Sequence, residues 1–295
     1  PIHLSDTVVS ALRNSEKKLR NLSETRFGCR AQKLPMSTAA ARFQSSPTDY
    51  ENDQKEVHSR ALFLSRRGSL REALELLLQG MLNYPTNVLF PFSAARIYSQ
   101  LNQVDKAREL FQRAVQISPN DSRTLQAWAV LEARQGDRKR AAELFREAVR
   151  ADPKHGAALQ AWALHEERCG DIGRARELLS RSAELGHCPA LQAAGMLESR
   201  AGNFDEARRH FRAATKMDPT HSQSWTAWAS MEWNLGNVAA ASETFRRGDA
   251  SSPKPHPPLL SAWATMEAKR GDVSFARELF LRALKRNPRH LQSLL

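Results

Sequence analysis

Cysteine is scarce in this 295-residue sequence, which contains only Cys29, Cys169 and Cys188. Their odd number and wide spacing match no metal-ligand or redox-pair motif, and a reducing compartment suits them better than secretion. No apolar run approaches the roughly 20 residues of a membrane span, and no segment reads as a cleavable secretory signal. The sequence also lacks a glycine-rich phosphate loop, a nucleophile motif and a metal-ligand spacing of histidines. We therefore expect no enzyme, cofactor, metal or small-molecule substrate.

Acidic residues are the minority among the charged side chains. The chain has 44 Lys and Arg against 32 Asp and Glu, which gives a net charge of +12. Residues 1–56 hold nine basic and seven acidic side chains, so most of the excess lies on residues 57–295. A basic folded surface favours polyanionic partners such as nucleic acid. Many helical proteins that bind no RNA are also basic, so charge alone does not decide between the two.

Helix-breaking residues recur at a nearly constant interval. The intervals are 34, 34, 34, 32, 34 and 35 residues, and the breakers are Gly68, Asn102, Gly136, Gly170, Gly202, Gly236 and Gly271. Seventeen residues after each breaker stand Pro85, Pro119, Pro153, His187, Pro219, Pro253 and Pro288. Nine residues after each breaker the side chain is large and apolar, as in Leu77, Phe111, Phe145, Leu179, Phe211, Phe245 and Phe280. Repeats of this length indicate a solenoid.

The spacing within each interval predicts two helices. Apolar residues recur at steps of three and four, which is the helical period, and the breaker separates the helices. The residue after most breakers is expected to cap the second helix, at Asp137, Asp171, Asn203, Asn237 and Asp272. One pair cannot bury its apolar face alone, so neighbouring pairs must stack. The sequence therefore predicts an all-α, right-handed α-solenoid of about seven helix pairs over residues 57–295.

A tryptophan and a glutamate mark the first helix of the later pairs. Tryptophan stands eight residues before the breaker, except for Ala194 in the fifth pair, and glutamate follows four residues later. These signature residues are Trp128 and Glu132, Trp162 and Glu166, Glu198, Trp228 and Glu232, and Trp263 and Glu267. We interpret the tryptophans as core side chains rather than base-stacking platforms. Buried carboxylates need partners, and the candidates are Arg108, Arg176, Arg208 and Arg277. Catalysis would need one converging site, not five equivalent ones.

These motifs resemble two related families of helical repeats. The length and the alanine, phenylalanine and proline columns are similar to the tetratricopeptide (TPR) repeat. The Trp-Ala-x-x-Glu motif resembles the half-a-TPR (HAT) repeat family, strongly over residues 122–295 and more weakly over 57–121. The variant at Leu125–Asp137 is most similar to the chloroplast HAT proteins of the psbB mRNA maturation factor type. The resemblance implies RNA processing, in which the solenoid binds single-stranded leader RNA and so matures and stabilises the transcript.

Polar and basic columns on the first helices are the candidate RNA-binding residues. By analogy with the TPR arrangement, the positions 13, 10, 6, 3 and 2 residues before the breaker face the concave side, and the columns ten and two before it are polar and basic. The expected contacts are Arg134, Arg168, Arg200, Asn234 and Lys269, then Gln126, Gln160 and Gln192, and finally Trp233. One cation per repeat suits a phosphate backbone, amides suit bases or sugars, and Trp233 suits stacking. An ordinary solvated face would have the same composition, and the sequence leaves this alternative open.

The two ends of the sequence fall outside the complete repeats. Residues 1–56 are expected to be a flexible segment with a possible helix over 6–22. The acid-free, Ser- and Ala-rich stretch 25–48 resembles an organellar transit peptide, and a disordered linker explains it equally well. Because the sequence starts at Pro1 and stops within an eighth repeat, we expect a fragment at both ends.

Three functions compete at this point. The first is a chloroplast RNA-binding solenoid that matures or stabilises mRNA and has other RNA-processing proteins as further partners. The second is a nuclear HAT scaffold for pre-mRNA splicing or 3′-end processing, which holds proteins and touches RNA little. The third is a general TPR protein–protein adaptor. The basic facing column favours the first, and the full-length N terminus would separate the first two.

Overall fold

The computed structural model describes residues 47–254 and 256–286, and every element in those ranges is an α-helix. The helices are α3 (Pro47–Arg67), α4 (Leu70–Asn83), α5 (Leu89–Gln100), α6 (Val104–Ile117), α7 (Ser122–Gln135), α8 (Arg138–Ala151), α9 (Gly156–Cys169), α10 (Ile172–Glu184), α11 (Cys188–Arg200), α12 (Phe204–Met217), α13 (Ser222–Asn234), α14 (Val238–Ala250), α15 (Pro257–Arg270) and α16 (Val273–Arg286). By the contacts within the chain, residues 1–53 and residues 54–295 form two separate units. The possible helix 6–22 and the start of an eighth repeat lie outside the described residues.

Each breaker lies between the two helices of a pair, in the left-handed backbone conformation. The breakers have φ between 56° at Asn102 and 100° at Gly271. Glycine adopts this conformation at little cost because it has no Cβ, so a single glycine is enough to end the first helix. The second helices α6 and α8 each end one residue before a pre-proline position. At Ser118 and Asp152, φ is −137° and −142°, because the following proline disfavours the helical conformation.

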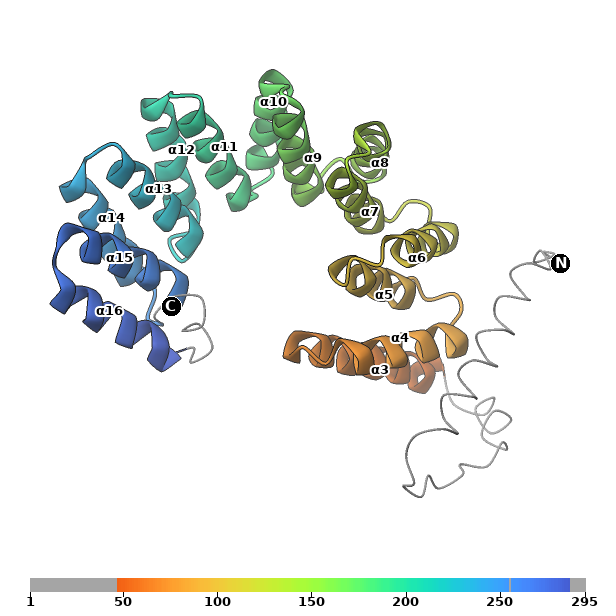
Figure 1. Cartoon of the computed structure of the whole chain (residues 1–295). Helices are drawn as coiled ribbons and strands as arrows, with labels where there is room; N and C mark the ends of the chain where they lie inside the picture. The colour runs from red at the N-terminus through yellow and green to blue at the C-terminus, as the bar shows by residue number, and fades with distance from the viewer. Residues whose placement is uncertain (1–46, 255, 287–295) are drawn as a thin grey trace. The chain divides into compact units, whose positions relative to one another are not determined.

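The helix pairs stack in chain order (Figure 1). First helices also lie against the first helices of neighbouring pairs, from α5 to α7 and onward to α15, whereas no two second helices of the described residues pack together to this extent. The row of helix pairs curves, and the first helices, which are closer to one another, lie on its inner side (Figure 1). The surface that they form is called the inner face below. The surface of the second helices is the outer face. The predicted α-solenoid is confirmed.

Small and large side chains alternate at the contacts between helices. The phenylalanines of the column nine after the breaker are buried in the second, third, fifth and sixth pairs. They pack where the opposite helix has a small residue. A Cβ added to Gly195 on α11 would lie 2.7 Å from Cε1 of Phe211 on α12, so the two helices approach too closely for any larger side chain.

The predicted caps hold where the residue is aspartate and are wrong where it is asparagine. Asp137 and Asp171 accept hydrogen bonds from the backbone N–H groups of Arg140 and Arg174, at 3.0 and 2.8 Å. Asn203 and Asn237 make no side-chain cap. Their amides donate instead to buried glutamates, because asparagine has a donor group that aspartate lacks.

The buried apolar residues form three clusters, and one boundary coincides with the missing tryptophan. Trp128 packs against both the first cluster and the second, and so joins them. The second cluster ends on α11 and the third begins on α12, in the pair that has Ala194 at the tryptophan position. The boundary between these two clusters therefore falls in the pair without the indole, although α11 and α12 still touch at Gly195 and Phe211. In the part of the chain that the structure describes, no helix is long and apolar enough to cross a membrane.

Candidate binding surfaces of the solenoid

The signature tryptophans and glutamates form hydrogen-bonded pairs within the first helices. The indole Nε1–H donates to Oε1 of the glutamate one turn later because residues four apart lie on the same helix face. The distances are 2.9 Å for Trp128 and Glu132, 2.6 Å for Trp162 and Glu166, 3.2 Å for Trp228 and Glu232, and 3.0 Å for Trp263 and Glu267. The indole rings pack toward the second helices, as the stacking of Trp128 on Phe111 at 6.4 Å shows. This arrangement agrees with the structural interpretation of the motif.

Arginines of the preceding pair complete these sites, as predicted. Each guanidinium makes two hydrogen bonds to one carboxylate, from Arg108 to Glu132, from Arg176 to Glu198 and from Arg208 to Glu232. These bonds lower the pKa of the three glutamates below its ordinary value. A bidentate guanidinium–carboxylate pair is strong and directional, so it fixes one pair of helices against the next. The fourth candidate, Arg277 on α16, makes no such pair with the described residues.

Two glutamates lack an arginine from the preceding helix pair, for a reason visible in the sequence. The position six after the breaker is Ala142 before Glu166 and Ser242 before Glu267. Ser242 Oγ donates to Glu267 at 3.1 Å in place of the guanidinium. Arg270 Nη1 lies 3.1 Å from the other carboxylate oxygen of Glu267, an ion pair without hydrogen-bond alignment.

Two grooves lie on the inner face, and most of the candidate RNA-binding residues line them. The α9–α11 groove has a volume of about 480 Å³ and is lined by Gln160, Leu164, Glu167, Arg168, Gln192, Ala193, Met196 and Arg200. The α13–α15 groove has about 260 Å³ and is lined by Ser230, Trp233, Asn234, Phe245, Ala262, Thr265, Met266 and Lys269. The structure thus brings together seven of the nine candidate residues; Arg134 and Gln126 lie on α7, outside both grooves.

The basic column is exposed and mostly free of partners. Arg134, Arg168 and Lys269 make no hydrogen bond or ion pair with the described residues, and all three side chains are exposed. Arg200 differs because its Nη2 lies 2.5 Å from Oε1 of Glu167, which neutralises one cation of the column. The inner face therefore presents isolated positive charges beside apolar grooves.

The glutamine column joins neighbouring repeats. Gln126 Nε2 donates to the carbonyl oxygen of Ala157, and Gln160 Nε2 donates to that of Pro189, at 3.4 and 3.2 Å. Each bond runs from one first helix to the N-terminal turn of the next. Gln192 Nε2 instead lies 3.0 Å from Sδ of Met196. These amides already have partners, and their contact with RNA stays a prediction.

The apolar floor of the grooves is what the sequence reasoning missed. Leu164 and Met196 are in the column six before the breaker, which faces the same side as the basic column. In α9 and α11 this column is apolar beside the charges, whereas α13 and α15 have Ser230 and Thr265 at the same position. Trp233, half-buried in the α13–α15 groove, was predicted to lie on this face, and it does. Among residues 47–254 and 256–286, no cluster of His, Cys, Asp and Glu has the arrangement of a metal site.

Comparison with known proteins places these repeats in a family. Residues 92–121, 127–186 and 193–255 match the tetratricopeptide repeat family, and together these segments make up about half of the chain. The chain is therefore a helical-repeat protein of the tetratricopeptide type. The more specific HAT type stays a prediction. No curated protein matches the sequence.

Solved structures share the fold at low sequence identity. The yeast Tom70 structure superimposes with a TM-score of 0.60 at 19% identity, covering 82% of this chain and 50% of Tom70. A tetratricopeptide repeat protein from Parabacteroides merdae ATCC 43184 gives 0.54 at 18%, covering 79% of this chain and 93% of that one. Cut9, solved in the APC/C hetero-tetramer Cut9–Hcn1, gives 0.53 at 16%, covering 80% and 45%. At these identities the likeness shows the fold alone.

Proposed function

We propose that the protein is an interaction scaffold whose inner face holds an extended, acidic and apolar segment of a partner protein. The observation that carries this proposal is the composition of the two inner grooves. Each has an apolar floor that includes a methionine, Met196 or Met266, and a rim with an exposed, unpaired cation, Arg168 or Lys269.

The chemistry of the grooves suits a polypeptide. Apolar side chains of an extended segment gain free energy by leaving water for the groove floor, and methionine adapts its shape to different side chains. Acidic side chains of the same segment can reach the cations on the rim, which steers association and fixes the register. No nucleophile, metal cluster or converging carboxylate pair is needed for such a role. Cut9, which shares the fold, was solved in a complex with another protein.

A binding experiment tests this proposal directly. Fluorescence anisotropy would measure the affinity of a labelled peptide of alternating leucine and aspartate, against a leucine–lysine peptide of equal length. The variant R134A/R168A/K269A should bind the acidic peptide about tenfold more weakly, since three exposed ion pairs contribute about 0.5 kcal/mol each. The matched control is R146A/R150A/K285A, which removes three exposed cations from second helices and should bind as the wild type does. Equal losses in both variants would reject the inner face as the site.

Single-stranded RNA is the second candidate ligand of the same face. Trp233 favours it, because a half-exposed indole beside Asn234 and Lys269 offers a stacking surface next to a hydrogen-bonding amide and a cation. The chloroplast location and mRNA maturation expected from the HAT resemblance belong to this candidate, whereas the nuclear scaffold, which holds proteins and touches RNA little, belongs with the first proposal. Preference for single-stranded RNA over duplex RNA and over the acidic peptide, with a log–log salt slope near −0.7 per phosphate contacted, would replace the first proposal.

A further inference from the structure

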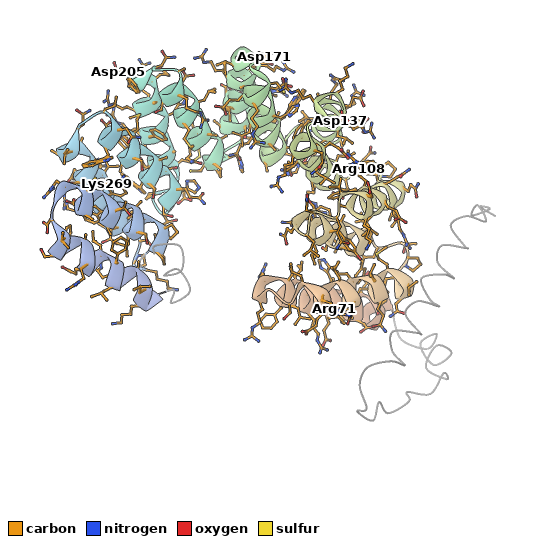
Figure 2. The ribbon with its side chains drawn as sticks, viewed as in Figure 1. Arg71, Arg108, Asp137, Asp171, Asp205 and Lys269 are labelled. Carbon is orange, nitrogen blue, oxygen red and sulfur yellow. The ribbon has the colours of Figure 1, made fainter. Side chains whose placement is uncertain are left out.

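A further groove lies on the outer face, in the repeat that lacks its tryptophan. It has a volume of about 930 Å³ and lies between α10 and α12, with α11 as its floor. Figure 2 marks its surroundings: Asp171 precedes α10, and Asp205 lies in the first turn of α12. Ala194, which occupies the tryptophan position, is one of the floor residues.

In the other late repeats, the equivalent space is filled by an indole of this chain. Trp128 stacks on Phe111 of the preceding second helix, and Trp263 stacks on Phe245 in the same way. The residue equivalent to these phenylalanines at the groove is Leu179, which also lines it. Both members of the aromatic pair are therefore smaller here, and the space between the two second helices stays open.

The carboxylate that would accept the hydrogen bond of the missing indole is nevertheless present and held in place. Glu198 is buried and held by Arg176 through two bonds of 2.6 and 2.9 Å and by Asn203 through one of 2.7 Å. In the repeats that have both the arginine and the tryptophan, Oε1 of the glutamate accepts one hydrogen bond from the arginine Nε and one from the indole. Glu132 and Glu232 are the two examples. Oε1 of Glu198 accepts only the arginine bond from the described residues.

We propose that this outer groove binds a tryptophan side chain of a partner polypeptide, with the indole stacked over Leu179 and Ala194 and its N–H donated to Glu198. The partner's indole would then take the position that Trp128, Trp162, Trp228 and Trp263 occupy in their own repeats. The site is separate from the inner face and does not depend on the function proposed there.

The chain itself does not offer the occupant. Its six tryptophans all lie within the described helices, and five of them are the buried or half-buried core residues 128, 162, 225, 228 and 263. The sixth, Trp233, is half-buried in the α13–α15 groove on the inner face. Five of these indoles are already packed in their own repeats and Trp233 lies in a groove of the inner face, so we assign the indole to a different polypeptide.

A fluorine NMR titration tests the site with a defined probe. The probe is a capped Gly-Ser-Trp-Ser-Gly peptide containing 5-fluorotryptophan, and the unlabelled phenylalanine version competes with it. We expect the fluorine resonance to shift on addition of the wild-type chain, and the phenylalanine peptide to compete about tenfold more weakly because it leaves the buried carboxylate oxygen without its donor. Absence of any shift at millimolar peptide would overturn the proposal.

Two variants locate the binding. Ala194→Trp fills the groove with the residue that four other repeats have, and Ser180→Arg obstructs it from the exposed surface of α10 without touching the core. Both should abolish the shift while circular dichroism shows an intact helical fold. R134A/R168A/K269A should keep the shift, which separates this site from the inner face. Undiminished binding by both groove variants would overturn the proposal, whatever the inner face binds.

Discussion

Arg208 on α12 donates two hydrogen bonds to the buried carboxylate of Glu232 on α13, at 2.8 and 3.0 Å. The pair joins the second helix of one repeat to the first helix of the next. Trp228 and Asn237 add one bond each to the same carboxylate. Four hydrogen bonds from three side chains of two repeats therefore meet at one buried charge, and the Trp–Glu motif joins one repeat to the next.

Arg208→Ala should destabilise the protein through this joint. The variant leaves Glu232, which is 4% exposed, without its main partner. A buried charge that loses a hydrogen-bonded partner costs about 1–3 kcal/mol. Urea unfolding measures the change. Arg209→Ala on the same helix is the control, since Arg209 is exposed and its pair with Glu206 is worth well under about 1 kcal/mol. Equal effects of the two substitutions would contradict the joint.

The pH dependence of stability should follow from the same carboxylates. Hydrogen bonds from Arg108, Arg176 and Arg208 lower the pKa of Glu132, Glu198 and Glu232 below the ordinary 4.5. A lowered pKa in the folded state stabilises the fold above 4.5, and this contribution is lost as the pH falls below that value. Urea midpoints should therefore be steady from pH 7 to 5 and fall below about pH 4.5. In R208A the fall should be shallower. A stability that rises on acidification would show that these pairs are not formed.

Gly195→Ala should destabilise the chain although alanine is the better helix former. The added Cβ would lie 2.7 Å from the buried ring of Phe211. Overpacking of this kind costs about 1–3 kcal/mol, against a gain of about 1 kcal/mol in helix propensity. Gly173→Ala on α10 is the control, because its nearest outside atom is 3.7 Å away, and it should stabilise slightly. Thermal unfolding of both variants measures the difference, and a more stable G195A would refute the close helix approach.

Ala194→Trp should raise the stability of the free protein. The indole would enter the outer groove, stack over Leu179 and donate to Glu198, as the tryptophans of four other repeats do with their own neighbours. Burial of a large apolar side chain contributes about 1.5–3 kcal/mol. Thermal unfolding would record a higher midpoint. A lower midpoint would mean that the groove does not have the shape of an indole.

The repeat pattern predicted the fold because a single physical requirement explains the residue type at each recurring position. Glycine at the breaker is required by the left-handed backbone, and the small and phenylalanine columns fit together at the helix contacts. The arginine partners of the glutamates were also predictable, since a buried carboxylate needs a donor. Asn203 and Asn237 were misjudged because capping by asparagine competes with a nearby buried acceptor, which only the packed structure reveals.

The candidate sites were harder to predict than the fold. The sequence predicted that the candidate RNA-binding residues lie on the inner face. It did not predict the hydrogen bonds of Gln126 and Gln160 to the next repeat, because these depend on how closely the first helices approach each other. The outer groove was visible in the sequence only as an exception: Ala194 where tryptophan was expected, in the neighbourhood of a 32-residue interval. The groove is open because Leu179 on α10 and Ala194 on α11 are each smaller than the aromatic residues at the equivalent positions. A sequence pattern does not show that these two residues lie next to each other.

Photo-crosslinking of an inner-face peptide tests the central claim most directly. A leucine–aspartate peptide that carries a benzophenone would be irradiated with the wild-type chain, and mass spectrometry would locate the attachment points. The account predicts crosslinks to α9, α11, α13 and α15, concentrated at Met196 and Met266 in the groove floors. Crosslinks confined to the second helices, or none that an excess of unlabelled peptide removes, would contradict it.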